Sequence, residues 1–269
     1  MSGLQRRSDA GLFCCPEWPA CHREAHGMAW VATKQVIGAG TPVWELATRI
    51  AISAYFSWAG LGAANQQLRW ALEQDFGQLT AADFLYFSAE TTGTVFQLVI
   101  AILVLVRYSR LAGTGGIYPR LVALLGSFFF LFFVPFLSRY DLSPAVAILS
   151  ILLMLSGSIL ATVVLLYLGR SFSILPEARR LVVTGPYRFV RHPLYATEMI
   201  CMLGYIAQFT PWTSVILFLA QLAIQLERMR IEEQLLSRIF PEYEIYASNT
   251  AQLIPGLCPR RISKALPWQ

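Results

Sequence analysis

The chain has 269 residues, of which 56% are hydrophobic and only 14% are charged, and its mean hydropathy is +0.52. Soluble domains are roughly 45–50% apolar and about 25% charged, so this composition excludes an ordinary soluble protein and indicates a membrane protein. The net charge of +5 does not indicate nucleic-acid binding, because the basic residues lie between apolar runs along the whole chain and form no patch.

The first 42 residues are polar and irregular, and we expect a disordered N-terminal tail. Thiolate and imidazole groups suit zinc, and the tail carries five of them at Cys14, Cys15, Cys21, His22 and His26. Their spacing does not form a pair of ligand knuckles, so we expect no metal site, and the five cysteines form no disulfide framework. No apolar core follows Arg6-Arg7, which argues against a cleaved signal peptide, and Met28 is a possible alternative start.

Residues 43–168 are predicted to form a region of four membrane helices. A helix needs about 20 apolar residues to cross a bilayer. Four apolar runs approach or exceed that length, at Val43–Ala64, Ser88–Val106, Tyr118–Leu137 and Pro144–Leu168. The polar residues 65–83 are expected to form a loop. Gly157, flanked by Ser156 and Ser158, marks a place where helices can approach closely. Glu90 and Gln97 are seven residues apart, so they share a helix face and could point into the protein.

Residues 169–269 begin with a basic, Pro-containing segment up to His192. The apolar runs 194–209 and 212–227 follow, split at Thr210-Pro211. Each is short for an independent span, so a tight helical hairpin is predicted. The second run continues as a polar helix through Phe240, where Pro241 stops it. The predicted fold class is therefore all-α, a multi-span membrane protein with a C-terminal hairpin and a cytoplasmic helix that binds a cofactor.

The distribution of basic residues predicts the orientation. With the N-terminus in the cytoplasm, every Lys and Arg except Arg69 and Arg139 falls on the cytoplasmic side. Cytoplasmic loops of membrane proteins carry an excess of Lys and Arg. The sequence therefore predicts an integral multi-pass protein in the lipid bilayer with both termini in the cytoplasm.

The segment LVVTGPYRFVRHPLY, residues 181–195, is rich in Arg, His, Tyr and Pro although it lies between apolar runs. Thr184-Gly185-Pro186 predicts a turn, and Pro193 suits the first turn of a helix. Tyr195 and Glu198 then share a face of that helix. A carboxylate at the mouth of an apolar helix is costly without a partner or a ligand.

Four pieces of sequence occur in a particular order: GPYRFVRHPLY, then Arg230-Ile231-Glu232-Glu233, then Phe240–Tyr246, then Leu253-Ile254-Pro255. In this order the chain resembles the integral membrane methyltransferases of the isoprenylcysteine carboxyl methyltransferase and phospholipid methyltransferase family, over about residues 169–256. The resemblance implies an S-adenosylmethionine-dependent methyltransferase whose acceptor is lipophilic or partitions into the membrane.

The same resemblance implies the site residues. Those expected to contact the cofactor are Tyr187, Arg191, His192, Pro193, Tyr195, Glu232, Glu233, Tyr243 and Tyr246. A carboxylate suits the ammonium and sulfonium of the cofactor, but Glu232 and Glu233 point about 100° apart, so both cannot do one job equally. Arg191, Tyr195 and Asn249 are candidates near the acceptor. Asn249 stands where isoprenylcysteine methyltransferases carry an Arg, which argues against a prenylcysteine carboxyl acceptor.

Two other interpretations remain at this point. Sterol-type membrane reductases that use NADPH share an RHP-x-Tyr motif, but this chain places Glu232-Glu233 where dinucleotide phosphates would need cations. A non-catalytic transporter or scaffold is the other, although the sequence shows no internal repeat of the kind common in transporters. The sequence leaves open whether the acceptor is a carboxylate, an amine or a sulfur compound, and it does not predict an oligomeric state.

Overall fold

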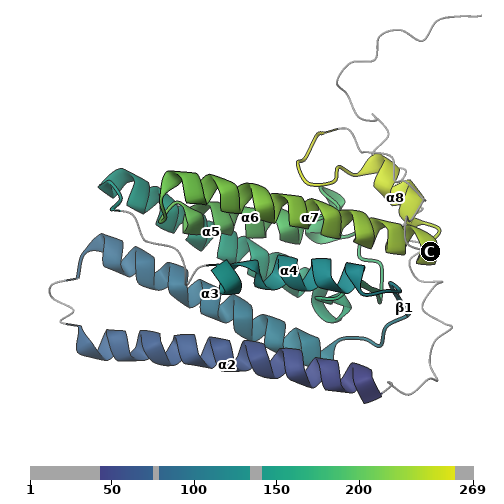
Figure 1. Cartoon of the computed structure of the whole chain (residues 1–269), viewed down its shortest axis with the longest axis horizontal. Coiled ribbons are helices and arrows are strands. Elements are labelled where there is room, and N and C mark those ends of the chain that lie inside the picture. The colour runs from purple at the N-terminus through teal and green to yellow at the C-terminus, as the bar shows by residue number, and fades with distance from the viewer. Residues whose placement is uncertain (1–42, 75–78, 134–140, 258–269) are drawn as a thin grey trace, which may run out of the picture.

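The structure is a computed structural model that describes residues 43–74, 79–133 and 141–257. Seven α-helices are described within these ranges (Figure 1). They are α2 (Val43–Glu73), α3 (Ala81–Val106), α4 (Tyr118–Phe133), α5 (Pro144–Leu168), α6 (Pro193–Ile206), α7 (Pro211–Ile239) and α8 (Tyr243–Asn249). The predicted N-terminal tail, with its Cys and His residues, lies outside the described residues.

The prediction of a mostly helical fold is confirmed. Short non-helical pieces connect the helices at one end of the molecule. The two-residue strands β1 (Ala112–Gly113) and β2 (Glu177–Ala178) pair antiparallel, with Ala112 opposite Ala178. The 3₁₀ turns η3 (Gly169–Ser171) and η4 (Gly185–Arg188) lie before and within the motif segment.

Local sequence explains where several helices begin. Thr80 caps α3 in a capping box with Asp83, each side chain accepting from the other's backbone N–H. Pro144, Pro193 and Pro211 occupy the first turn of α5, α6 and α7, where a missing N–H costs nothing. The predicted breaks at Pro193 and Thr210-Pro211, and the end of α7 before Pro241, therefore agree with the structure.

The expected loop at residues 65–83 is partly wrong. α2 continues through Glu73 and α3 already begins at Ala81. Two residues in this stretch contact the neighbouring helix: Gln67 Nε2 donates to Thr94 Oγ1 over 2.8 Å, and the Trp70 ring stacks on Phe87 with centroids 5.3 Å apart. These contacts with α3 favour an extended α2 over a loop, and the other polar residues here are exposed along the helix.

The four long membrane helices are only partly supported. Within the described residues, Ala81–Val106 and Pro144–Ser171 are long and apolar enough to cross a membrane. α4 has 16 residues, fewer than the roughly 20 that a span needs. α2 has 31 residues but carries charged side chains, among them Glu45, Arg49 and Arg69, which lower its hydropathy.

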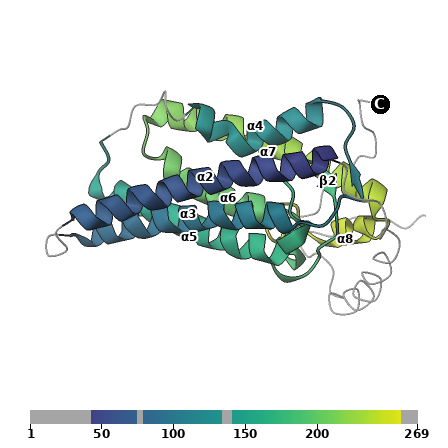
Figure 2. The same ribbon diagram turned by 90° about the horizontal axis from the view of Figure 1, so that it is seen from below.

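The bundle is organised around α5, which packs against α3 and against α6. Gly157 of α5 lies against the backbone of Cys201, and Gly204 of α6 lies against Ser150 and Met154. Ser150 Oγ also donates to Gly204 O over 2.6 Å. Small residues permit this close approach, as expected for Gly157. α2 packs on α3, and α4 packs on α7. In the view from below, α4 and α5 lie on opposite sides of the molecule (Figure 2).

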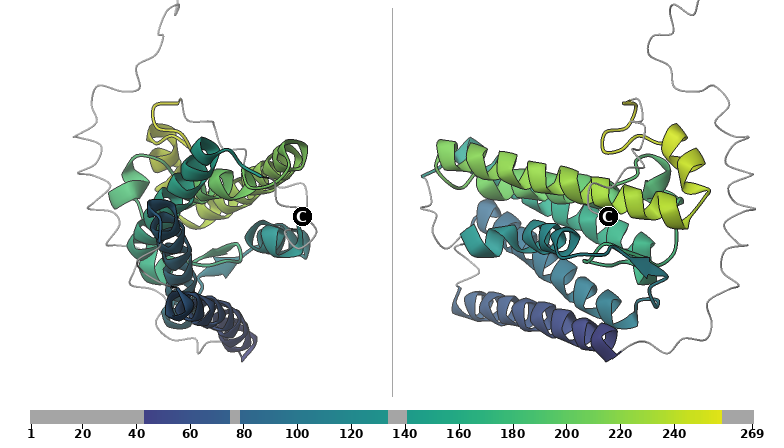
Figure 3. Two further views of the ribbon diagram at one scale, coloured as in Figure 1. Left: turned by 90° about the vertical axis from the view of Figure 1, so that its left-hand side faces the viewer. Right: turned by 45° about the vertical axis from the view of Figure 1, so that its right-hand side comes forward.

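One end of the molecule gathers the connections and most of the described basic residues. The start of α2, the end of α3, the β1–β2 pair, the start of α6, the end of α7 and α8 all lie at this end (Figures 1 and 3). Buried Glu45 there pairs with Arg49 (2.9 Å) and Arg179 (3.2 Å), which ties α2 to the segment before the motif. Arg69 lies in the other half of α2. We call this the basic end.

Candidate active site

A cavity of about 740 Å³ lies among the helices, within the roughly 300–1,000 Å³ of typical ligand sites. It is lined by residues of α2 to α8 and of the segment that joins α5 to α6. Seven of the predicted site residues line it: Tyr187, Arg191, His192, Tyr195, Glu232, Tyr243 and Tyr246. The cavity extends from this group, at the basic end, between the apolar helices.

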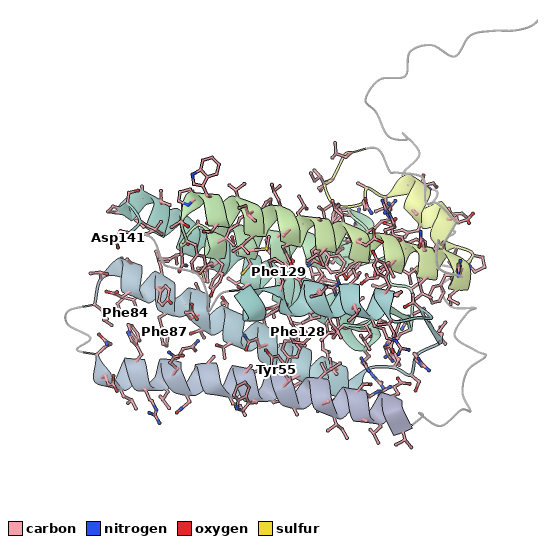
Figure 4. The ribbon with its side chains drawn as sticks, viewed as in Figure 1. Tyr55, Phe84, Phe87, Phe128, Phe129 and Asp141 are labelled. Carbon is pink, nitrogen blue, oxygen red and sulfur yellow. The ribbon has the colours of Figure 1, made fainter. Side chains whose placement is uncertain are left out.

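Aromatic side chains border the cavity between α2 and α4. Tyr55 and Phe128 point toward one another, with ring centroids 5.2 Å apart in an edge-on arrangement (Figure 4). Phe56 also contacts Phe128, at 6.0 Å between centroids. All three rings line the cavity, so its wall on this side is apolar.

The motif segment is held by backbone geometry. Gly185 has φ +62°, a left-handed conformation that favours glycine, and its missing side chain leaves room for the Tyr167 ring. The backbone N–H of Arg191 donates to Ala251 O over 2.8 Å, and that of His192 donates to Gln252 O over 3.1 Å. These bonds dock the chain after α8 against the motif and fix the direction of both side chains.

Arg191 is buried, and two of its three side-chain nitrogens donate hydrogen bonds within the protein. Its Nε donates to Glu233 Oε1 over 2.8 Å, and its Nη1 donates to Ala247 O and Thr250 O over 2.6 and 3.0 Å. Its Nη2 is buried without a hydrogen-bond partner. A buried, unpaired guanidinium nitrogen is costly, and the Arg191 side chain lines the cavity, so a ligand oxygen that reached this nitrogen would complete its hydrogen bonds.

Glu233 faces away from the cavity and holds the motif. It accepts from Arg191 and forms a 3.0 Å hydrogen bond with His192 Nε2. Burial would raise the pKa of the Glu233 carboxyl, but the hydrogen bond with His192 and the charges of His192 and Arg191 bring this pKa below its usual value. Glu233 is therefore an ionised buried partner that positions Arg191 and His192.

Glu232, one position earlier, lines the cavity. The Tyr195 hydroxyl donates to its Oε1, and the Arg228 guanidinium lies 4.9 Å from the centre of the Tyr195 ring. Arg228 is buried, whereas Arg230 is exposed and pairs with Glu227 at 3.0 Å. The late part of α7 thus has one solvated charged face and a second face that lines the cavity.

Tyr187, Tyr243 and Tyr246 form an aromatic wall near Glu232. The Tyr246 hydroxyl donates to Tyr187 O over 2.6 Å, and the rings of Tyr243 and Tyr246 lie 5.8 Å apart. Burial raises the pKa of all three phenols, so they remain neutral at physiological pH. This wall can pack against a planar ring.

Besides Glu233, two predicted site residues do not line the cavity. Pro193 is buried at the start of α6 and does not line the cavity. Asn249, the candidate near the acceptor, is exposed on α8, where its Nδ2 donates to Ile245 O over 2.9 Å, and it does not line the cavity either.

Sequence reasoning did not identify three residues of α7 as part of the site: Gln221, Gln225 and Arg228. Together with Glu232 they are spaced by four, three and four residues, the spacing of one helical face, and all four line the cavity. This spacing of polar residues in a helix is the sequence feature that could have identified them. Gln225 Nε2 donates over 3.2 Å to Glu198, the carboxylate whose position already predicted a partner or a ligand.

Residues 142–243 match a family model described as phospholipid methyltransferase. This part of the chain is similar to that family. The matched region contains α5, α6 and α7, and with them Arg191, His192, Tyr195, Glu232 and Glu233. Members of the family are methyltransferases, and the match and the two apolar helices together indicate a membrane protein.

Two curated relatives are similar over 82 residues each. The nickel-cobalt-cadmium resistance protein NccN of Alcaligenes xylosoxydans xylosoxydans is 39% identical, over 30% of this chain and 38% of its own. The cobalt-zinc-cadmium resistance protein CzcN of Cupriavidus metallidurans is 35% identical, over 29% of this chain and 36% of its own. The chain therefore spans little more than a third of the length of either relative.

Proposed function

We propose that the protein is an S-adenosylmethionine-dependent methyltransferase that acts on a lipophilic or membrane-partitioning acceptor. One observation carries the proposal: side chains from the motif segment and from the end of α7, far apart in the sequence, line a single cavity in a phospholipid methyltransferase domain. The predicted site residues that line the cavity lie toward the basic end, and the rest of the cavity runs between helices that are mostly apolar.

The groups in the cavity fit the cofactor. S-adenosylmethionine has a carboxylate, an ammonium, a sulfonium and an adenine, and when bound it supplies an activated methyl group. Arg191 Nη2 is a buried donor without a partner and suits the carboxylate. Glu232 offers a carboxylate to the positive groups, and the wall of Tyr187, Tyr243 and Tyr246 suits the adenine.

The protein's own residues then act by positioning. Glu233 fixes Arg191 and His192, while Tyr195, whose ring lies against the Arg228 guanidinium, orients Glu232. Holding the two reactants in line and excluding water can be worth roughly 7–11 kcal/mol of barrier. Neither Arg191 nor Glu232 needs to exchange a proton for this role.

We further propose that the basic end faces the cytoplasm, with both termini on that side. The described Lys and Arg residues other than Arg69 belong to elements at this end, which satisfies the positive-inside rule. The acceptor would then reach the site through the apolar part of the cavity. The names of the two relatives describe resistance to metal ions and no reaction, so they do not bear on the acceptor.

Calorimetry of the purified full-length protein in detergent tests the proposal, with S-adenosylmethionine and NADPH titrated separately. We expect binding of S-adenosylmethionine and of its demethylated product, and no binding of NADPH. Tight binding of NADPH with no response to either of the other two compounds would replace the methyltransferase by the reductase.

A further inference from the structure

Two arginine–aromatic pairs lie on the surface of the basic end. The Arg170 guanidinium is 4.4 Å from the centre of the Tyr108 ring, and the Arg188 guanidinium is 4.9 Å from the centre of the Phe189 ring. Both arginines are exposed, and the Tyr108 and Phe189 rings are 38% and 57% exposed. None of these four side chains lines the cavity, so the two pairs are separate from the candidate active site.

The end of α5 holds both pairs. The backbone N–H of Tyr108 donates to Arg170 O over 2.8 Å, which joins the residues that follow α3 to the residues that follow α5. The turn η4, which contains Arg188, also packs on α5, and the Tyr167 ring fills the space beside Gly185 at the start of this turn. Both pairs therefore lie close to the last turn of α5.

This turn is also where the two helices that are apolar enough to cross a membrane, Ala81–Val106 and Pro144–Ser171, come to an end. Both expose apolar side chains in their last turns, as Val106 is 45% exposed and Leu166 is 58% exposed. In membrane proteins, aromatic rings concentrate where the acyl chains meet the headgroups, and arginines beside them reach the headgroups. The two pairs therefore lie at the depth of the lipid headgroups.

The positive charge of the two arginines is not balanced by a carboxylate. In the described part of the chain neither Arg170 nor Arg188 forms a salt bridge, whereas Arg49 and Arg191 each pair with a glutamate. Arg170 uses only its Nε, which donates to Val106 O over 2.6 Å. A guanidinium can bind a phosphate through two parallel hydrogen bonds, and an aromatic ring stacked on it holds it in place. Both arginines can therefore bind an anion.

We propose that the pairs Tyr108–Arg170 and Arg188–Phe189 form a surface that binds the headgroup phosphate of an anionic phospholipid. A lipid fits better than a soluble phosphate, because the exposed apolar side chains at the ends of α3 and α5 can contact its acyl chains. A zwitterionic lipid fits less well, because its ammonium offsets the phosphate charge. This lipid is distinct from the methyl acceptor, and the proposal does not rest on methyl transfer. Arg188 shares η4 with Tyr187 of the cavity wall, so the bound lipid would stabilise the turn at which the motif begins.

The test measures lipid binding to the delipidated full-length protein in a non-ionic detergent, by the anisotropy of fluorescent phosphatidylglycerol and fluorescent phosphatidylcholine. One arginine near a membrane surface contributes about fivefold to the affinity for anionic lipid. The double variant Arg170→Gln/Arg188→Gln should therefore bind phosphatidylglycerol roughly 25-fold more weakly than wild type. Arg188→Gln alone should lose about fivefold, and it removes no side-chain hydrogen bond among the described residues. It therefore decides the outcome if the double variant does not fold.

Arg230→Gln/Arg238→Gln is the matched control, because it removes the same charge from exposed positions in the polar late part of α7. We expect it to change lipid affinity by less than about twofold. The surface is supported if phosphatidylglycerol binds more tightly than phosphatidylcholine and if only the variants at Arg170 and Arg188 weaken it. The proposal is overturned if both lipids bind equally, if Arg188→Gln binds like wild type, or if the control loses as much affinity as the double variant. Displacement of the lipid by millimolar inorganic phosphate would identify a site for a soluble anion and would overturn it as well.

Discussion

The adjacent residues Glu232 and Glu233 are predicted to have different roles, and paired substitutions separate them. Glu232→Gln removes the charge that faces the cavity but keeps an oxygen for the Tyr195 hydroxyl. A charge-assisted hydrogen bond is worth about 1.5–3 kcal/mol, so the affinity for S-adenosylmethionine should fall by roughly 10- to 150-fold. Because the carboxylate would contact the cofactor before and during the reaction, the Michaelis constant should rise more than turnover falls.

Glu233→Gln should act mainly on stability. Glu233 is buried and accepts from Arg191 at 2.8 Å, with His192 Nε2 at 3.0 Å. Breaking a buried ion pair by removing one charge typically costs about 3–5 kcal/mol, because the other charge stays buried. The thermal midpoint in detergent should therefore drop clearly, while that of Glu232→Gln should stay close to wild type.

The assay measures two quantities on each variant: cofactor affinity by calorimetry and the midpoint of thermal unfolding. Glu227→Gln serves as the control, since its ion pair with Arg230 is on the surface and such pairs contribute about 0–1 kcal/mol. If Glu232→Gln binds the cofactor like wild type, or if Glu233→Gln unfolds like wild type, the assignment of the two carboxylates is wrong.

Three further predictions concern pH, packing and topology. The pKa of Glu233 is lowered on folding. The ionised Glu233 carboxylate therefore stabilises the fold above the ordinary pKa of 4.5, and this stabilisation is lost as the pH falls through the lower folded-state pKa. The thermal midpoint of wild type should fall over this pH range, and that of Glu233→Gln should not. Gly157→Val should destabilise the bundle by about 1–3 kcal/mol or more, because the added carbons meet the backbone of Cys201; Gly62→Val, at a glycine with open space around it, is the control for thermal unfolding. A cysteine introduced at position 69 should react with a membrane-impermeant reagent added outside intact cells. A cysteine at position 110 should react only after the cells are permeabilised, and the reverse pattern would contradict the orientation.

Local signals allowed the second half of the fold to be predicted well. α5 begins at Pro144 and ends at Leu168 as expected, and prolines mark the starts of α6 and α7. The end of α2 was harder to predict, because the ends of the helices were inferred from hydropathy. Gln67 is polar, and its hydrogen bond to Thr94 depends on how α2 packs against α3. Hydropathy cannot detect polarity that is satisfied by a neighbouring helix.

The candidate site could likewise be predicted only in part from the sequence. The motif and the Glu pair could be identified from the sequence, because their order along the chain resembles a known family. Which glutamate faces the cavity depends on the rotation of α7 about its axis, and packing against α4 and the motif determines that rotation. Gln221 and Gln225 were missed because a single glutamine in a helix is ordinary, and their shared face becomes informative only once the cavity is known. Asn249 was placed near the acceptor by its offset from Tyr246, whereas it lies on the exposed face of α8.

The central claim is that the motif segment and the end of α7 together form the S-adenosylmethionine site. Ultraviolet cross-linking of methyl-labelled S-adenosylmethionine to the full-length protein, followed by peptide mapping, tests it most directly. We predict label in peptides that contain Tyr195 or Glu232–Tyr246, competed by the demethylated product and not by NADPH. Label confined to peptides of α2 or α3, or no label that the demethylated product competes, would contradict the account.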